Sequence, residues 1–335
     1  MEGYSQLSVI DPWQGASGVV QTWYLVPEGI QAPAGIDQSY VIHVPVRRIV
    51  CMSTTHLSMI SAIGESRSIA GFSGTRLIFD RDLSEKAAEG IIREVGYDDN
   101  LNKELIMNLN PDIVIVYGIG SESAGYIGKL RELGVPVFFD ADYLEDNPLG
   151  KAEWLKAIGE LFCKKQKADS IFGRVESRYN KLRDYIKAGI KERPKVLLGL
   201  PFKDTWYISP GNSYISNLIR DAGGDYLWEE TESRYSMPLS PESVYIKALA
   251  AGYWLNTGVA ESLKDILAID TRLAELPPFR DKMVFNNTLR INKDGGNDYW
   301  EGGTVNPDVI LADIASILHP DLFQGRNLVY YKKLN

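Results

Sequence analysis

Apolar and polar positions follow two different periods along the chain. Short apolar runs rich in β-branched and aromatic residues predict strands, and stretches with apolar residues three and four positions apart predict helices. The two kinds alternate, as they do where helices flank parallel sheets. We predict strands at 47–53, 68–74, 112–118, 135–140, 195–200, 252–258 and 283–287, and helices at 56–64, 102–109, 123–133, 213–222, 240–250 and 306–318.

The middle of the chain breaks this alternation. After a helical stretch at 150–162, residues 164–192 carry apolar side chains at spacings of three and four with charges between them. This pattern predicts one amphipathic helix of about 25 residues, roughly 38 Å long. Pro194 ends it, because the residue before a proline avoids helical geometry. A helix of this length between two α/β halves would act as a strut and allow little hinging.

We therefore predict an α/β protein of two lobes, each with a central, mostly parallel sheet flanked by helices, joined by one long interlobe helix. Alternating stretches near the two ends, 18–26 and 327–334, are expected to add strands that pack on the body or pair together. The predicted parts are an N-terminal extension at 1–40, an N-terminal lobe at 41–146, the interlobe helix at 150–192, a C-terminal lobe at 193–325 and a tail at 326–335.

Composition and charge restrict the function. The chain has 335 residues, 44% of them hydrophobic and 24% charged, which is typical of a globular protein. Its net charge of −8 argues against a nucleic-acid partner, which requires a basic face. We find neither an apolar run approaching a membrane helix nor a signal peptide, which fits a cytoplasmic protein or an exported one without its leader. Cys51 and Cys163 are expected to be small buried groups.

One loop resembles a phosphate-binding turn. Gly118-Ile119-Gly120 follows an apolar strand and precedes a helix, as in a dinucleotide-binding fingerprint. The match is partial, because Ser123 stands at the third glycine, although Asp140 ends the next strand at a suitable distance. We favour the simpler interpretation that the glycines allow a sharp turn at a strand end.

Ligands of parallel sheets sit at the carboxyl ends of the strands. The loops there are rich in aromatic side chains, which in such positions often face a ligand, although some of them are expected only to cover loop bases. The candidate ligand-binding residues are Thr54, Thr55, His56, Arg76, Tyr97, Tyr117, Trp206, Tyr207, Trp228, Arg234, Tyr235, Tyr299 and Trp300, with Arg81 and Arg290 as further cations.

Catalytic chemistry is not indicated. Of the three histidines, His43 and His319 read as structural, and His56 starts a helix at a strand end. No spacing of His, Asp and Glu suggests a metal site, no nucleophile elbow occurs, and no carboxylate pair reads as an acid and base. We expect neither an enzyme nor a resident metal or cofactor.

Several stretches, in order, resemble the substrate-binding proteins of bacterial ABC importers for metal chelates, namely siderophores, haem and cobalamin. The resemblance covers about 45–323, and the termini look like those of Bacteroidetes homologues. It is carried by "RIVCMSTTHLSMISAIGESRSIAGFSG", "LNKELIMNLNPDIVIVYG", "LRELGVPVFF", "IGELFCKKQKADSIF" (with Cys163 where a glycine is usual), "ISNLIRDAGGDYLW", "LSPESVYIKALAAGYWL" and "NPDVILADIASILHPDLF".

The resemblance implies a periplasmic monomer that holds its ligand between two lobes and delivers it to an ABC permease and its ATPase. It also implies a lipid anchor, whose cysteine and leader are not in this sequence. Glu104 and Glu242 match the glutamates with which each lobe docks onto permease arginines. Asn102 and Ser240 are plausible N-caps, so both glutamates fall in exposed first helical turns, where they would also complement the helix dipole.

The resemblance leaves the ligand open. An iron chelate of the siderophore type is the first expectation, and a corrinoid or haem is the alternative. Tyr97 and Trp300 resemble aromatic positions of cobalamin binders, arginines would suit ferric siderophores, and His56 or Tyr207 would serve as an axial ligand of haem. A helix beginning near Thr54 would favour an anionic group. Other classes also stay open: a bilobed enzyme or metallocluster protein, and a carbohydrate- or peptide-binding protein.

Overall fold

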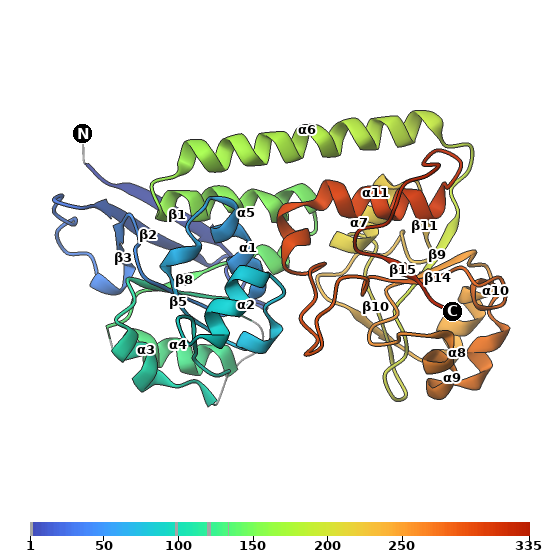
Figure 1. Cartoon of the computed structure of the whole chain (residues 1–335), viewed down its shortest axis with the longest axis horizontal. Helices are drawn as coiled ribbons and strands as arrows, with labels where there is room; N and C mark the ends of the chain where they lie inside the picture. Colours follow the sequence, from blue (N-terminus) through green and yellow to red (C-terminus); the bar gives the residue numbers. More distant parts are fainter. Residues whose placement is uncertain (1–2, 98–99, 119–121, 133) are drawn as a thin grey trace. The chain divides into compact units, whose positions relative to one another are not determined.

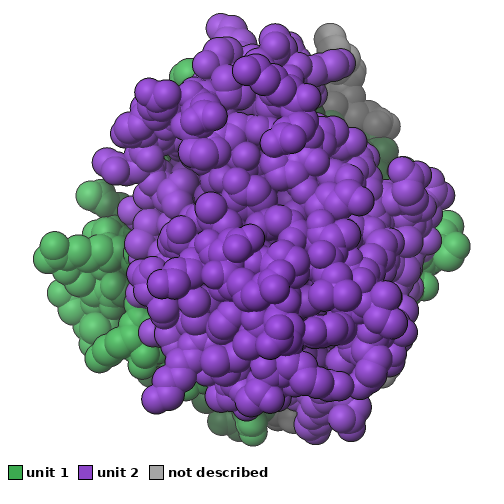
Figure 2. Space-filling view, turned by 90° about the vertical axis from the view of Figure 1, so that its right-hand side faces the viewer, with its two compact units in different colours: residues 1–145, 150–174, 292–305 green, residues 146–149, 175–291, 306–335 purple. Residues whose placement is uncertain are grey.

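The computed structural model describes every residue except 1–2, 98–99, 119–121 and 133 (Figure 1). The chain forms two compact units, coloured separately in Figure 2. Unit 1 comprises 1–145, 150–174 and 292–305, and unit 2 comprises 146–149, 175–291 and 306–335.

Unit 1 is built on a five-stranded parallel sheet in the order β6-β5-β4-β7-β8. Its strands are β4 (Ile49–Cys51), β5 (Ile69–Phe72), β6 (Arg93–Glu94), β7 (Ile113–Val116) and β8 (Val137–Phe139). All residues of β4, β5, β7 and β8 are buried, so these runs are apolar throughout rather than alternating. The sequence predicted these four strands, whereas β6 is too short to leave a pattern.

Helices cover both faces of this sheet. They are α1 (Thr54–Ala62), α2 (Arg81–Ala88), α3 (Lys103–Leu109), α4 (Glu122–Glu132) and α5 (Pro148–Leu161). Figure 1 shows α1 and α5 on one side of the sheet and α3 and α4 on the other. This is the layered arrangement that right-handed crossovers between parallel strands produce.

The N-terminal extension forms a sheet of its own on unit 1. Its strand β2 (Val20–Pro27) pairs antiparallel with β1 (Ser5–Ile10) and parallel with β3 (Val41–Val44). Trp23 of β2 is fully buried, donates its indole N–H to the carbonyl of Val137 at 2.8 Å, and meets the Phe138 ring edge-on. The predicted strand at 18–26 thus packs on the body, and it does not pair with the C-terminal tail.

Unit 2 has a second five-stranded sheet in the order β11-β9-β13-β14-β15. Four strands are parallel, and the tail strand β15 runs antiparallel to β14. A separate antiparallel pair is formed by β10 (Trp206–Ile208) and β12 (Met237–Leu239). The other strands are β9 (Lys195–Leu198), β11 (Asp225–Tyr226), β13 (Tyr253–Leu255), β14 (Val284–Asn286) and β15 (Lys332–Lys333), and the helices are α7 (Tyr214–Asp221), α8 (Pro241–Ala248), α9 (Leu263–Ile269), α10 (Pro277–Arg280) and α11 (Pro307–Leu318).

The long helix predicted for the middle of the chain is α6 (Lys165–Gly189), with 25 residues. The boundary between the units falls inside it, after Arg174. Between α5 and α6 the chain turns at Cys163, whose φ of 54° is left-handed and explains why a glycine suits this position. Cys163 is exposed rather than buried as predicted, while Cys51 is buried.

The predicted C-terminal lobe at 193–325 has to be redrawn, because residues 292–305 belong to unit 1. The Asn292 amide donates to the carbonyls of Arg76 and Ile78, at 3.1 and 3.0 Å. The Glu301 carboxylate accepts the backbone N–H groups of Phe79 and Asp80, both at 2.8 Å. We call 292–305 the strap. These contacts join residues more than 200 positions apart, so no local pattern predicts them.

Candidate functional site

Three tyrosines from separate strand ends meet on unit 1. Tyr97 follows β6 and Tyr117 follows β7, and their hydroxyl oxygens lie 2.6 Å apart. Tyr143, which follows β8, packs edge-on against the Tyr117 ring at 6.2 Å and donates its O–H to the carbonyl of Gly118. Tyr97 is 51% exposed and Tyr117 is partly exposed, so the pair is accessible to solvent. Sequence reasoning missed Tyr143, although it lies in a loop that follows a predicted strand.

Gly118, at the start of the glycine loop, packs against the protein's own N-terminal extension. A Cβ atom at Gly118 would lie 2.3 Å from the Cβ of Trp13, and the carbonyl of Gly118 accepts the N–H of Gln14 at 2.8 Å. A glycine at 118 therefore makes room for Trp13, and the phosphate interpretation finds no support here. Ile119, Gly120 and the side chain of Ser123 lie outside the described residues.

The prediction that His56 contacts the ligand or serves as an axial ligand is wrong, because its side chain is completely buried. It sits in α1, which begins at Thr54 after the N-cap Ser53; Thr54 is partly exposed and Thr55 is buried. The His56 Nε2 atom lies 3.8 Å from Oδ2 of Asp140. Burial lowers the pKa of His56 to about 4, so the imidazole is neutral near pH 7.

The strap presents two of the predicted aromatics on unit 1. Trp300 is 51% exposed, and its ring meets that of Tyr299 edge-on at 4.7 Å. Tyr299 itself is buried and supports Trp300 rather than offering a surface. The neighbouring Glu301 is also buried, which raises its pKa to about 7 although two backbone N–H groups act in the opposite direction. Arg76 and Arg81 are both exposed, and Arg81 pairs with Glu85 at 2.7 Å.

On unit 2 the predicted aromatics divide into core and surface. The prediction that Trp206 contacts the ligand is wrong, because its side chain is fully buried. Its indole N–H donates to the carbonyl of Leu198, and its ring packs against Trp254. Trp228 is 6% exposed, with the Lys247 ammonium 4.9 Å from its ring centre. The exposed candidates of this unit are Tyr207, Arg234, Tyr235 and Arg290.

The two predicted docking glutamates occupy the expected local structure. Glu104 lies in the first turn of α3, where the Asn102 side chain accepts the N–H of Leu105. Glu242 lies in the first turn of α8, where Ser240 is the N-cap. Both glutamates are exposed. The two N-cap predictions are therefore confirmed.

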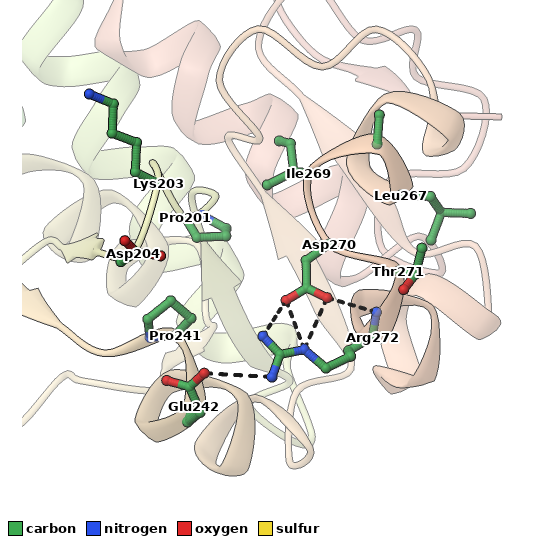
Figure 3. Close-up of a pocket in the computed structure, with 11 residues that line it drawn as sticks. Pro201, Lys203, Asp204, Pro241, Glu242, Leu267, Ile269, Asp270, Thr271 and Arg272 are labelled. Carbon is green, nitrogen blue, oxygen red and sulfur yellow. Dashed lines mark hydrogen bonds and ion pairs between the residues drawn. The ribbon is translucent and has the colours of Figure 1, made fainter.

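Glu242 belongs to a charged cluster on unit 2, drawn in Figure 3. Its Oε1 atom lies 3.5 Å from Nη1 of Arg272. The Arg272 guanidinium is held by Asp270, with three N···O distances from 2.7 to 3.1 Å. A pocket of about 660 Å³ opens beside this cluster, lined by Pro201, Lys203, Asp204, Pro241, Glu242, Leu267, Ala268, Ile269, Asp270, Thr271 and Arg272.

The residues that the structure describes contain no group of three or more His, Cys, Asp and Glu side chains placed to hold a metal ion. No helix in this part of the chain is both long and apolar enough to cross a membrane.

Two α/β units that share a 25-residue helix, with aromatic residues at their strand ends, are the architecture of a bilobed binding protein. Residues 49–277 match the family described as periplasmic binding protein. The chain belongs to this family of substrate-binding proteins, whose members are periplasmic or extracytoplasmic.

Relatives and solved structures agree with this membership. An uncharacterized lipoprotein of Methanocaldococcus jannaschii is 29% identical over 313 residues, covering 89% of this chain and 71% of that protein. The high-affinity heme uptake system protein IsdE of Staphylococcus aureus is 26% identical over 145 residues, 43% of this chain and 47% of its own length.

Solved structures share the fold. The periplasmic heme-binding protein RhuT of Roseiflexus matches with a TM-score of 0.60 at 24% identity, over 82% of this chain and 99% of its own. The vitamin B12-binding protein BtuF of Vibrio cholerae matches with a TM-score of 0.58 at 16% identity, over 84% and 99%. The predicted fold class is confirmed.

Proposed function

We propose that this protein captures a ferric chelate and delivers it to an ABC permease. The observation that carries the choice of iron is the exposed Tyr97–Tyr117 pair, with its hydroxyl oxygens 2.6 Å apart. Hard cations favour oxygen ligands, and a tyrosine phenolate is an established axial ligand of haem iron. When one phenol of the pair loses its proton to bind iron, the other donates a hydrogen bond to the phenolate.

The surroundings of the pair suit a flat or bulky chelate. Tyr143 supports the Tyr117 ring from the side, and Trp300 adds an exposed ring to the same unit. Rings suit large, partly apolar ligands, while the exposed Arg76 offers charge to their carboxylate groups. Siderophores and haem share this chemistry, and the haem-binding names of IsdE and RhuT make haem the first chelate to test.

A corrinoid is the second candidate. The structural match to BtuF, a vitamin B12-binding protein, favours it, and so do the exposed rings of Tyr97 and Trp300. A corrinoid brings its own cobalt ligands, so its binding would need the rings but not the phenol oxygens.

Delivery requires a partner in the membrane. We infer that Glu104 and Glu242, both exposed in first helical turns, pair with arginines of the permease. We further propose that the native protein is a lipid-anchored monomer, in keeping with the lipoprotein names of its relatives.

Calorimetric titration with hemin, ferric siderophores and cyanocobalamin tests the ligand. We expect one-to-one binding of a ferric chelate at micromolar affinity or tighter, which corresponds to about −8 kcal/mol. The double variant Tyr97→Phe/Tyr117→Phe should weaken this binding roughly tenfold or more, because it removes the oxygen ligand. For hemin it should also abolish any tyrosinate-to-iron absorption band.

Tyr185→Phe is the matched control, because Tyr185 is 54% exposed and lies on α6, away from the strand ends. It should bind like the wild type. Binding of cyanocobalamin alone, or full affinity for iron chelates in the double variant, would contradict the role of the phenol pair.

A further inference from the structure

Two adjoining pockets on unit 2 share their walls. The pocket of about 660 Å³ described above is bordered by charged side chains. A second pocket of about 280 Å³ is lined by Pro201, Trp206, Pro241, Glu242, Tyr245, Ile246, Asp270, Arg272, Leu273 and Glu275. Both are lined by Pro201, Pro241, Glu242, Asp270 and Arg272, and we call the shared charged cluster of Glu242, Asp270 and Arg272 the partition. We call the pocket of about 660 Å³ the acidic pocket and the pocket of about 280 Å³ the apolar pocket.

The acidic pocket has an excess of negative charge. Asp204, Glu242 and Asp270 line it, together with Lys203 and Arg272. Arg272 is committed to Asp270 by three short contacts and reaches Glu242 only at 3.5 Å. Figure 3 shows Lys203 extending away from the other labelled side chains, and its ammonium lies 5.4 Å from the Phe202 ring centre. The carboxylates of Asp204 and Glu242 therefore dominate the charge of the acidic pocket, and they favour binding of a cationic group.

The apolar pocket differs from the acidic pocket because the surface that it exposes is mostly apolar, although Glu242, Asp270, Arg272 and Glu275 also line it. Tyr245 and Ile246 contribute to its lining, and so do Trp206 and Leu273, whose side chains are almost fully buried. Ile246, which lines this pocket, is 72% exposed and so leaves apolar surface in contact with water. Burying that surface against an apolar group of a partner would stabilise a complex.

We propose that the two pockets receive neighbouring side chains of the permease, a basic one in the acidic pocket and an apolar one in the apolar pocket. This inference rests on the proposed docking of Glu242, and it extends one ion pair to a recognition surface. The partition fixes the distance between the two side chains. Arg272 is a positioning residue here, because its link to Asp270 holds it against Glu242 at the partition.

The test uses the full-length protein and its transporter complex in lipid nanodiscs, with affinity and ATPase stimulation as readouts. Asp204→Lys reverses a charge in the acidic pocket and should weaken binding roughly tenfold or more, with a shallower salt dependence. Asp281→Lys is its matched control, because Asp281 is exposed, lines neither pocket and undergoes the same change of charge. It should remain within about twofold of the wild type.

The apolar pocket is tested by Ile246→Asp, which should also weaken binding roughly tenfold or more. Leu249→Asp is its control, because Leu249 is 50% exposed just after the same helix and lines neither pocket. All four proteins should keep wild-type ligand affinity and wild-type unfolding midpoints, since every substituted side chain is exposed.

The double variant Glu104→Ala/Glu242→Ala separates this inference from the function on which it rests. If the double variant no longer stimulates the ATPase while Asp204→Lys and Ile246→Asp still do, the docking proposal is supported and the inference about the pockets is overturned. If the double variant stimulates normally, the docking proposal itself fails. A dimer in solution that Asp204→Lys or Ile246→Asp dissociates would show that a second copy fills the pockets, which also overturns the inference.

Discussion

Four ionisable side chains are gathered in the interior of unit 1. His56 and Asp140 are fully buried with 3.8 Å between Nε2 and Oδ2, and Asp142 pairs with the ammonium of Lys151 at 3.2 Å. Burial and the nearby Asp142 raise the pKa of Asp140, while burial lowers the pKa of His56 to about 4. The interior therefore resists charge on both members of the His56–Asp140 pair.

The stability of the protein should depend on pH through His56. The pKa of His56 is depressed from its ordinary 6.5 to about 4, so below pH 6.5 the unfolded chain binds a proton that the folded protein refuses. The contribution of His56 to stability therefore falls as the pH is lowered from 6.5 toward 4. At pH 5 the loss relative to pH 7.5 should be about 2 kcal/mol.

Urea unfolding of the wild type and His56→Gln at pH 7.5 and pH 5 measures this effect. Asp140 has a raised pKa and acts in the opposite direction, so the difference between the two proteins isolates His56. The exposed His43 provides the control His43→Gln, which should not change the pH dependence. Equal losses in wild type and His56→Gln would show that His56 is not held neutral.

At the scale of single residues, the sequence predicted the features that depend on residues close by in the chain. The N-caps Asn102 and Ser240 were predictable, because a cap bonds to backbone two or three positions away. His56 and Trp206 were misplaced, because their burial is decided by distant segments. Gly118 illustrates the same limit: the residue that requires a glycine there is Trp13, more than 100 positions earlier.

At the scale of elements, helix α11 holds the C-terminal tail in place. Asp313 of α11 is fully buried, and its Oδ2 atom accepts the backbone N–H groups of Val329, Tyr330 and Tyr331 at 2.8, 2.6 and 3.4 Å. The tail then continues into β15, which closes the sheet of unit 2 against β14. One carboxylate thus anchors the final strand.

Asp313→Asn should release this tail. The amide oxygen of asparagine can still accept the three backbone N–H groups, but it carries no charge, and the amide NH2 group then faces the Arg326 guanidinium in place of a carboxylate oxygen. We expect a loss of roughly 3 kcal/mol in the free energy of unfolding, because three hydrogen bonds lose their charged acceptor and Arg326 loses its ion pair. Urea unfolding measures the loss, and limited proteolysis should cleave the tail first.

Asp321→Asn is the matched control, since Asp321 is exposed near the same tail. It should unfold like the wild type and keep its tail protected. An Asp313→Asn protein with an equally protected tail would show that the β14–β15 pairing suffices without the carboxylate.

Element boundaries were predictable where the apolar period is sustained. Helix α6 keeps its spacing over 25 residues, and the parallel strands are continuous apolar runs. The two-residue strands β6 and β11 are too short to show a period, and the β10–β12 pair lies among exposed loop residues. Whether the N-terminal strands pack on the body as a separate sheet or pair with the tail is a tertiary choice that alternation does not decide.

For the whole molecule, the important feature is that neither unit is continuous in sequence. The chain passes from one unit to the other after residues 145, 149, 174, 291 and 305. Unit 1 is completed by the strap, which arrives only after most of unit 2 has been made. Unit 2 in turn receives α11 and the tail after the strap.

This arrangement predicts that the two units unfold together. Unfolding of unit 2 frees both ends of the strap, which removes Glu301 from the backbone of Phe79 and Asp80 and so destabilises unit 1. A chain of two independent domains would instead unfold in two steps. With 5-fluorotryptophan incorporated, the ¹⁹F signals of Trp23 in unit 1 and Trp254 in unit 2 should disappear at the same urea concentration.

Glu301→Ala sharpens the test, because it loosens the strap without touching the interior of unit 2. It leaves two backbone N–H groups without their acceptor and should cost roughly 1–3 kcal/mol. If the units are coupled, the midpoints of both tryptophan signals move down together, although the substitution lies in unit 1. A shift confined to Trp23, with Trp254 unchanged, would mean that the units are separate folding domains and that the strap only connects them.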